Sequence, residues 1–181
     1  FSLSRGLGDV YKRQLEHQKE YDYEVCSCFT NNPEAAGLSF CKEYKIDCKI
    51  IDHKNYNDRE EYDGLINSYL ENLNPDLIVL AGYMRIMSKS LVDNWEGQIV
   101  NIHPSLLPKY PGLNTHKRAL EAKDKTHGST IHFVTSELDS GPIIRQESFE
   151  IEPSDTEESL INKVKDLEHK IYPETISLLI K

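Results

Sequence analysis

The sequence lacks long apolar runs, paired cysteines and an excess of positive charge. No uninterrupted apolar stretch approaches the roughly 18 residues of a membrane-spanning helix, so we expect no membrane partner. The formal net charge is −9, whereas nucleic-acid binding needs a concentrated positive field, so we expect no nucleic-acid partner. The four cysteines show neither a CxxC pair nor a repeated metal-site spacing. We therefore expect reduced core or half-buried thiols in a cytoplasmic protein, and no metal site.

Length and composition fit one globular domain, except for the first residues. A chain of 181 residues with 38% hydrophobic residues and a mean hydropathy of −0.56 can bury a core in water. Residues 1–14, FSLSRGLGDVYKRQ, lack both the apolar centre of a signal peptide and the β-branched run of a buried strand. We predict that residues 1–14 are non-native or disordered, joined to a truncated gene, and that residues 15–181 form a single domain.

From residue 15 onwards, short apolar runs alternate with helical patterns, which is typical of α/β proteins. The continuous apolar run 77–81 indicates a central parallel strand that is buried on both faces. We predict a Rossmann-like open, twisted, mostly parallel sheet with helices on both faces, a C-terminal antiparallel strand pair and a long final helix. The expected strands are 23–29, 48–52, 77–81, 98–101, 129–135 and 143–149. The expected helices are 15–20, 34–44, 58–73, 88–94, 115–122 and one from 155 onwards, capped by Asp155 with Glu158 and bent near Pro173.

The stretch 100–112, VNIHPSLLPKYPG, is the most informative part of the chain. Asn101 and His103 stand two residues apart at the end of an apolar run, so in an extended chain their side chains point to the same side. Pro104 disfavours helical dihedrals at His103 and keeps it extended. An amide can hold a carbonyl oxygen, and an imidazole can move a proton near neutral pH. We therefore expect Asn101 and His103 to face one pocket.

Three segments that follow expected strands should meet at one edge of the sheet. Open α/β sheets bind ligands at the carboxyl ends of their strands, and here residues 82–87, 101–103 and 135–139 come after strands. An amide, an imidazole and the carboxylate of Asp139 that converge there suggest acyl-group chemistry. Taken singly, each residue is better explained as a turn, cap or structural residue, so the surrounding motifs decide.

Those motifs resemble the folate-dependent phosphoribosylglycinamide formyltransferases. The resemblance covers about residues 21–181 and is strongest in 81–87 (AGYMRIM), 101–112 and 128–141 (GSTIHFVTSELDSG), with support from 168–173 (EHKIYP). The related methionyl-tRNA formyltransferases and formyltetrahydrofolate hydrolases share the Asn-x-His core. They differ in the loop that follows, where LPKYPGL is similar to the glycinamide ribonucleotide branch.

The resemblance implies transfer of a formyl group from 10-formyltetrahydrofolate, the co-substrate, to the amine of glycinamide ribonucleotide in de novo purine biosynthesis. Asn101, His103 and Asp139 match the catalytic residues of the family. Asn101 would donate to the formyl oxygen, and His103 would stabilise that oxygen and relay a proton. Asp139 would keep the imidazole protonated, because a nearby opposite charge favours the charged form. No metal is implied.

The resemblance also implies which residues bind the substrates. The formyl-folate site comprises Arg59, Met84, Arg85, Ile86, Met87, Asn101, Thr135, Ser136, Glu137, Leu138 and Asp139. The ribonucleotide site comprises Lys165, Asp166, Leu167 and Glu168. Without this context, Met84 and Ile86 would be interpreted as core, and Arg59 and Glu168 as solvated helix charges. The remaining histidines receive no catalytic role and are expected at the surface or behind the site; these are His116, His127, His132 and His169.

The family opens with a buried strand and a turn that cradles the ribonucleotide phosphate at a helix N-terminus. Residues 5–8, RGLG, do not match that turn, and no apolar strand precedes them. We therefore expect the first strand to be missing, the chain to be destabilised and the ribonucleotide to bind poorly. Two alternatives stay open: a formyltetrahydrofolate hydrolase, and a folate-binding module that has lost turnover. The oligomeric state is left open.

Overall fold

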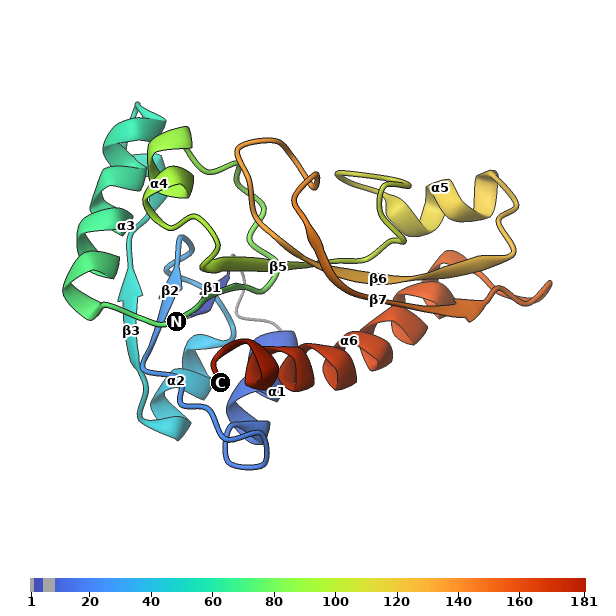
Figure 1. The fold of residues 1–181 in the computed structure, drawn as a ribbon, viewed down its shortest axis with the longest axis horizontal. Helices are drawn as coiled ribbons and strands as arrows, with labels where there is room; N and C mark the ends of the chain where they lie inside the picture. Colours follow the sequence, from blue (N-terminus) through green and yellow to red (C-terminus); the bar gives the residue numbers. More distant parts are fainter. Residues whose placement is uncertain (1, 5–8) are drawn as a thin grey trace.

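The sheet of the computed structural model has seven strands in the order β3-β2-β1-β4-β5-β6-β7 (Figure 1). The structure describes residues 2–4 and 9–181, and the side chains from residue 12 onwards. The five strands from β3 to β5 are parallel, whereas β6 pairs antiparallel with both β5 and β7. The strands are β1 Ser2–Ser4, β2 Ser27–Thr30, β3 Asp47–Ile50, β4 Ile78–Leu80, β5 Ile99–His103, β6 Thr126–Phe133 and β7 Ile143–Glu150. The predicted fold class is confirmed.

Helices cover both faces of the sheet. They are α1 Asp9–His17, α2 Leu38–Tyr44, α3 Arg59–Leu73, α4 Lys89–Asn94, α5 Thr115–Glu121 and α6 Glu157–Leu179, with a short 3-10 helix at His53–Asn55. Helices α3 and α4 pack on one face through Ile66 and Leu91, whereas α6 packs on the other through Tyr172. Figure 1 shows α6 running along β5, β6 and β7, with α5 on the opposite side of these strands. Among the described residues, no helix combines the length and apolarity that a membrane crossing requires.

Polar residues define where the helices begin. Asp58 accepts a hydrogen bond from the Glu60 amide at the start of α3, and Ser88 accepts one from the Leu91 amide at the start of α4. Helix α6 begins with a capping box of Thr156 and Ser159. This pair replaces the predicted Asp155 with Glu158, because the Asp155 carboxylate accepts instead from Ser159 Oγ, Lys163 Nζ and the Glu152 amide.

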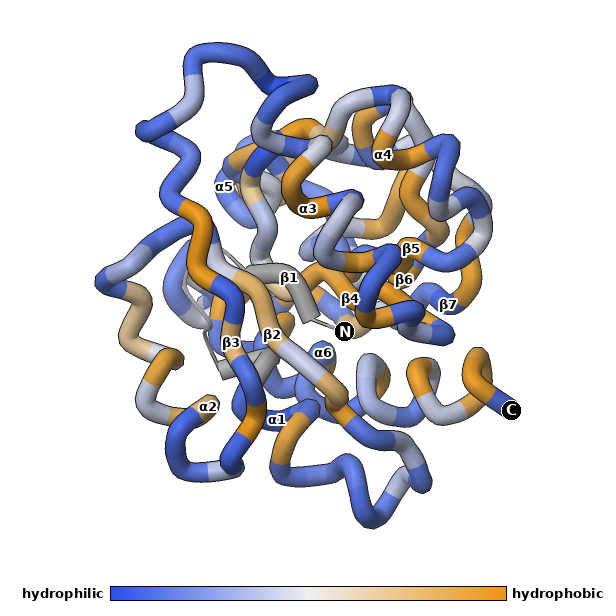
Figure 2. The backbone as a smooth tube through the Cα atoms, turned by 90° about the vertical axis from the view of Figure 1, so that its left-hand side faces the viewer, coloured by the Kyte–Doolittle hydropathy of each residue, from blue (hydrophilic) through white to orange (hydrophobic). Residues whose placement is uncertain are grey.

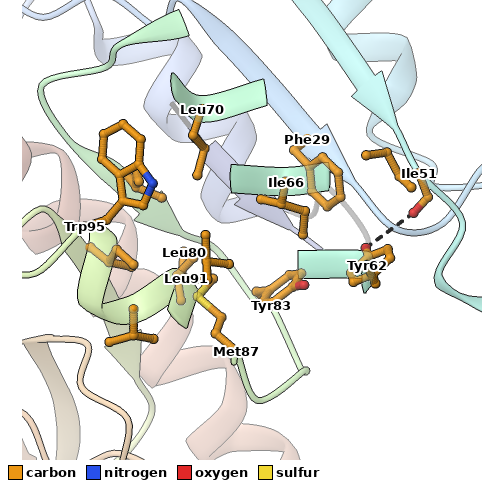
Figure 3. Packing of buried hydrophobic residues seen from close by; sticks show 13 residues of the cluster. Phe29, Ile51, Tyr62, Ile66, Leu70, Leu80, Tyr83, Met87, Leu91 and Trp95 are labelled. Carbon is orange, nitrogen blue, oxygen red and sulfur yellow. Dashed lines mark hydrogen bonds between the residues drawn. The ribbon is translucent and has the colours of Figure 1, made fainter. Parts of the chain in front are cut away.

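The sheet has a hydrophobic core on each face, and successive side chains of the strands point alternately into one core or the other. One core joins Phe29, Ile78 and Ile99 to α3 and α4, and its tyrosine Tyr62 donates from its hydroxyl to the Ile51 carbonyl oxygen at 3.3 Å (Figure 3). The other face of the same strands packs against α1, α2 and α6. Figure 2 shows hydrophobic residues along the strands and hydrophilic residues over the peripheral loops. Two-sided burial is the property that the apolar run 77–81 predicted.

The beginning of the chain differs from the expectation of a missing first strand. Strand β1 lies between β2 and β4, and Leu3 pairs with Phe29 and Leu80. Its backbone can complete the sheet without a β-branched run, because strand pairing uses main-chain groups. Helix α1 begins at Asp9, before the predicted helix at 15–20. Residues 1 and 5–8, on which the prediction of an unmatched phosphate turn falls, lie outside the described residues. The non-native origin of residues 1–14 stays a prediction.

Candidate active site

Strand β5 carries the amide and the imidazole to one cavity. Its residues alternate so that Asn101 and His103 share one side, and both line a cavity of about 450 Å³ at the carboxyl ends of β4 and β5. Asn101 is half-buried and His103 is 5% exposed. The expectation that these two residues face one pocket is confirmed.

Asp139 reaches the imidazole from the loop after β6. Its Oδ2 lies 3.4 Å from His103 Nδ1 and accepts a hydrogen bond from the Gly112 amide at 2.8 Å. The second ring nitrogen, Nε2, lies 2.9 Å from the Tyr110 carbonyl oxygen. Because both nitrogens of His103 face oxygen acceptors, only the doubly protonated ring can donate to both.

His132 lies behind Asn101, which is one of the two positions that the sequence analysis expected for it. It pairs with Asn101 across β5 and β6, and its Nε2 lies 3.3 Å from Asn101 Nδ2 and 3.7 Å from Asp139 Oδ1. Burial lowers the pKa of His132, which favours the neutral ring. In that form Nδ1 donates to the Phe133 carbonyl oxygen at 2.9 Å, and Nε2 accepts from the Asn101 amide. His132 therefore orients the amide of Asn101.

Most of the predicted folate residues surround this cavity or a second, adjoining one of about 70 Å³. Met84 and Ile86 are 59% and 50% exposed, so core packing does not account for them. Met87, in contrast, is buried in the core on one side and lines the smaller cavity on the other. The larger cavity is also lined by Arg85, Leu138 and Asp139, and the smaller one by Arg85, Ile86 and the segment 135–139. Arg59, exposed at the start of α3, lines neither cavity.

The predicted ribonucleotide residues lie on α6, behind β6. Lys165 and Asp166 are exposed and Leu167 is half-buried, and none of them lines either cavity. Glu168 is only 8% exposed, so it is not a solvated helix charge. Burial raises the pKa of Glu168 to about 7, against the lowering effects of Ser129 and Lys165.

Glu168 connects to the backbone of His103 through Ser129. Ser129 Oγ lies 2.8 Å from Glu168 Oε1 and 2.9 Å from the His103 carbonyl oxygen. A hydroxyl has one proton, so it can donate to both oxygens only in turn. When Glu168 is protonated, its carboxyl donates to Ser129 and Ser129 donates to the His103 carbonyl. A neutral Glu168 therefore satisfies every polar group in this connection.

The chain belongs to the formyl transferase family, whose model matches residues 3–176. Within that family it is 42% identical, over 153 residues, to the phosphoribosylglycinamide formyltransferase of Escherichia coli (strain K12), an alignment that covers 84% of this chain and 72% of the relative. It is also 42% identical over 156 residues to the trifunctional purine biosynthetic protein adenosine-3 of Gallus gallus, with 86% of this chain covered. The chain spans only 16% of the length of that relative.

Solved structures agree with the sequence relatives. The structure of the phosphoribosylglycinamide formyltransferase from Coxiella burnetii in complex with CHES superimposes with a TM-score of 0.93 at 41% identity. The match covers 97% of this chain and 83% of that chain. These relatives are formyltransferases, which favours the transferase prediction over the hydrolase.

Proposed function

We propose that this chain transfers the formyl group of 10-formyltetrahydrofolate to the amine of glycinamide ribonucleotide, a step of purine biosynthesis. Family membership and identities of 41–42% to phosphoribosylglycinamide formyltransferases support the reaction. The observation that carries the assignment is the meeting of Asn101, His103 and Asp139 at one wall of the cavity of about 450 Å³. The substrates are small molecules, and we propose the cytoplasm as the compartment.

Asn101 is proposed to stabilise the charge that forms during transfer. The substrate amine attacks the formyl carbon, a new C–N bond forms, and negative charge develops on the formyl oxygen. One proton of the Asn101 amide is directed to His132, which leaves the second amide proton for that oxygen. Removal of one such donor typically slows the chemical step by about 10²–10³-fold.

His103 is proposed to deliver a proton to the folate nitrogen as its bond to the formyl carbon breaks. The attacking amine loses a proton in the same reaction, so the ring is recharged over the cycle. Asp139 is proposed to orient the imidazole, because its Oδ2 lies 3.4 Å from Nδ1. Nε2 is hydrogen-bonded to the Tyr110 carbonyl oxygen. Nε2 can therefore deliver a proton to the folate only after the loop that carries Tyr110 moves.

The formyl-folate is proposed to bind across both cavities. Met84, Ile86 and Leu138 offer exposed, deformable apolar surface to a flat pterin ring. The segment 135–139 and Met87 form the inner wall. Arg59 lies away from both cavities, which suits contact with a carboxylate at the far end of a long co-substrate. The proposed reaction uses no metal.

The ribonucleotide is proposed to bind near residues 165–168. Glu168 lies behind β6, so in the conformation described it acts on the site through Ser129 and the His103 carbonyl. Glu168 can contact the substrate amine directly only if the β6 region rearranges.

Product analysis tests the proposed function. The full chain is incubated with 10-formyltetrahydrofolate in the presence and absence of glycinamide ribonucleotide, and formylated amine and free formate are measured. Formylated amine that falls by about 10²–10³-fold in Asn101→Ala supports the transferase. Formate release without the amine acceptor would favour the hydrolase. Folate binding without ribonucleotide binding or turnover would favour a binding module.

A further inference from the structure

Three cysteines from separate elements meet on the face of the sheet that α2 covers. Cys28 of β2, Cys41 of α2 and Cys48 of β3 bring their Sγ atoms within 4.8 Å of one another. Cys28 and Cys48 are in-register neighbours on adjacent parallel strands, which fixes their side chains on the same face. None of the four cysteines forms a disulfide. We refer to Cys28, Cys41 and Cys48 as the thiol cluster.

The surroundings of the thiol cluster are apolar. Its neighbours are Leu15, Val25, Ala35 and Ala81, with further half-buried aliphatic and aromatic side chains around them. Among the residues that the structure describes, no carboxylate or imidazole joins the three sulfurs at this distance. Burial, followed by hydrogen bonds with Cys41 and Cys48, raises the pKa of the Cys28 thiol. The Cys28 thiol at the centre of these contacts therefore strongly resists carrying a charge.

Charge balance decides which thiophilic ion this site can hold. Three thiolates around a monovalent ion leave a net charge of −2, and around a divalent ion they leave −1. A buried charge without a partner costs several kcal/mol. Zinc in addition favours four ligands, whereas the cluster offers three. A trivalent ion with three sulfur ligands leaves no net charge, so it fits both the number of thiols and the apolar surroundings.

We propose that the thiol cluster is a binding site for trivalent arsenic, which it holds as a neutral trithiolate. Arsenite is the uncharged hydroxide As(OH)₃ near neutral pH. Three As–O bonds break and three As–S bonds form, and each thiol proton leaves with a hydroxide as water. Arsenic stays trivalent, so the exchange needs neither an oxidant nor a base. The product has no formal charge to bury.

Geometry and access allow this exchange. Thiophilic ions with sulfur bonds of about 2.3 Å hold their sulfurs roughly 3.5–4 Å apart, so side-chain rotation has to draw the Sγ atoms together by about 1 Å. Cys48 is half-buried on the edge strand β3 and offers an entrance. Helix α2 has only seven residues, and Gly37 gives it no side-chain cap, so it can open locally at low cost. Figures 1 and 2 show α2 beside β2 and β3 at this end of the sheet.

The thiol cluster is separate from the proposed active site. None of its residues lines the cavities of about 450 and 70 Å³. Arsenic would join α2 to β2 and β3 and would thereby stabilise this edge of the sheet, since it binds the folded chain better than the unfolded one. The inference therefore does not depend on the proposed formyl transfer.

The test uses arsenite itself with the full reduced chain, kept reduced by a phosphine rather than a thiol. Native mass spectrometry counts the bonds: a trithiolate adds one arsenic and removes three hydrogens, whereas a dithiolate keeps one hydroxyl. We expect one trithiolate per chain and a higher melting temperature. Cys48→Ala, at a half-buried position, should lose the trithiolate adduct. Cys26→Ser is the matched control because Cys26 is exposed and outside the cluster.

Three outcomes would overturn the proposal: an adduct of the wild-type chain that keeps a hydroxyl, a trithiolate adduct that survives in Cys48→Ala, or its loss in Cys26→Ser. If Cys48→Ala does not fold, as judged by its circular dichroism, Cys41→Ala gives the same comparison. Preferential binding of Zn²⁺ over arsenite in direct competition would also contradict it, because the charge argument would then be wrong.

Discussion

Two buried groups of reactive side chains stand in contrast in this molecule. The polar cluster consists of Asn101, His103, His132 and Asp139, and the thiol cluster is the group of three cysteines on the other half of the sheet. The polar cluster is held by hydrogen bonds of 2.8–3.3 Å and opens onto a cavity. In the thiol cluster, the contacts of Cys28 and Cys41 to carbonyl oxygens are 3.9 and 3.8 Å long, and S–H is a weak donor.

The difference shows that proximity of reactive groups is insufficient for acid–base chemistry. The polar cluster lies where β5 ends and where loops can approach, so its groups have both partners and access to solvent. The thiol cluster lies within a layer between helix and strands, where its neighbours are apolar and burial raises the pKa of the Cys28 thiol. The chemistry that suits the thiol cluster is a covalent exchange that creates no net charge.

The largest expected effect comes from removing the imidazole of the polar cluster. We expect His103→Ala to lower kcat for formyl transfer by about 10²–10⁴-fold, because positioned proton transfer is lost. The matched change in the other cluster, Cys41→Ala, should leave kcat unchanged. Steady-state kinetics on chains with equal circular dichroism spectra measure both. Equal losses in the two variants would mean that the contrast between the clusters is wrong.

The sequence predicted the class of the sheet, mostly parallel with an antiparallel C-terminal pair, and the half of the polar cluster that one strand carries. It did not predict strand β1 between β2 and β4. Asn101 and His103 could be predicted because residues two apart on a strand share a side, and this needs no tertiary information. The parallel sheet could be predicted because buried strands leave continuous apolar runs such as 77–81. Strand boundaries were less accurate: the strand predicted at 23–29 is Ser27–Thr30.

The rest of the polar cluster depended on pairing between distant segments. His132 meets Asn101 only in the antiparallel register of β5 and β6, which the sequence did not fix. The burial of Glu168 depends in the same way on how α6 lies against β6. The thiol cluster has no recognisable spacing because its members come from β2, α2 and β3. That Asp139 and His103 lie at the same edge of the sheet could be expected because both follow strands, whereas their direct contact was implied only by the family resemblance.

The second prediction concerns the carboxyl group behind the polar cluster. The pKa of Glu168 is raised from 4.5 to about 7 by burial. Between these values the folded chain binds more protons than the unfolded chain, so the stability that protonated Glu168 contributes is full below pH 4.5 and is lost as the pH rises through 7. The loss is on the order of 3 kcal/mol. Glu168→Gln should lack it.

Urea unfolding of the wild type and Glu168→Gln at pH 5 and pH 8 measures this difference. The free energy of unfolding of the variant, relative to the wild type, should rise with pH. A constant difference would show that Glu168 is not a buried neutral acid. A difference that rises with pH would mean that the polar cluster, like the thiol cluster, is supported by a neutral buried group.

The third prediction tests whether His132 orients Asn101. His132→Phe keeps an aromatic ring but removes both nitrogens, so the Asn101 amide loses its acceptor. One hydrogen bond contributes about 0.5–1.5 kcal/mol, so kcat should fall about tenfold or less, a smaller loss than in Asn101→Ala. KM for the formyl-folate should change little. A loss as large as that of His103→Ala would instead make His132 a proton-transfer group.

The smallest expected effect distinguishes the apolar thiol cluster from the polar one at a single atom. Cys28→Ala should cost about 1 kcal/mol of unfolding free energy, because a small buried group is removed from a packed layer. Cys28→Ser restores nearly the same volume, yet its hydroxyl is buried among thiols and aliphatic groups. The Phe29 carbonyl oxygen lies 3.9 Å from the sulfur position, which is too long for an O–H···O hydrogen bond, and a poorly satisfied hydroxyl costs about 1–3 kcal/mol. Serine should therefore be the less stable variant by about 1 kcal/mol, whereas the same pair at exposed Cys26 should agree within about 0.5 kcal/mol. Urea unfolding of all four variants measures this order. A Cys28→Ser chain as stable as the wild type would mean that polar partners surround the cluster, and the charge argument for a neutral trithiolate would then fail.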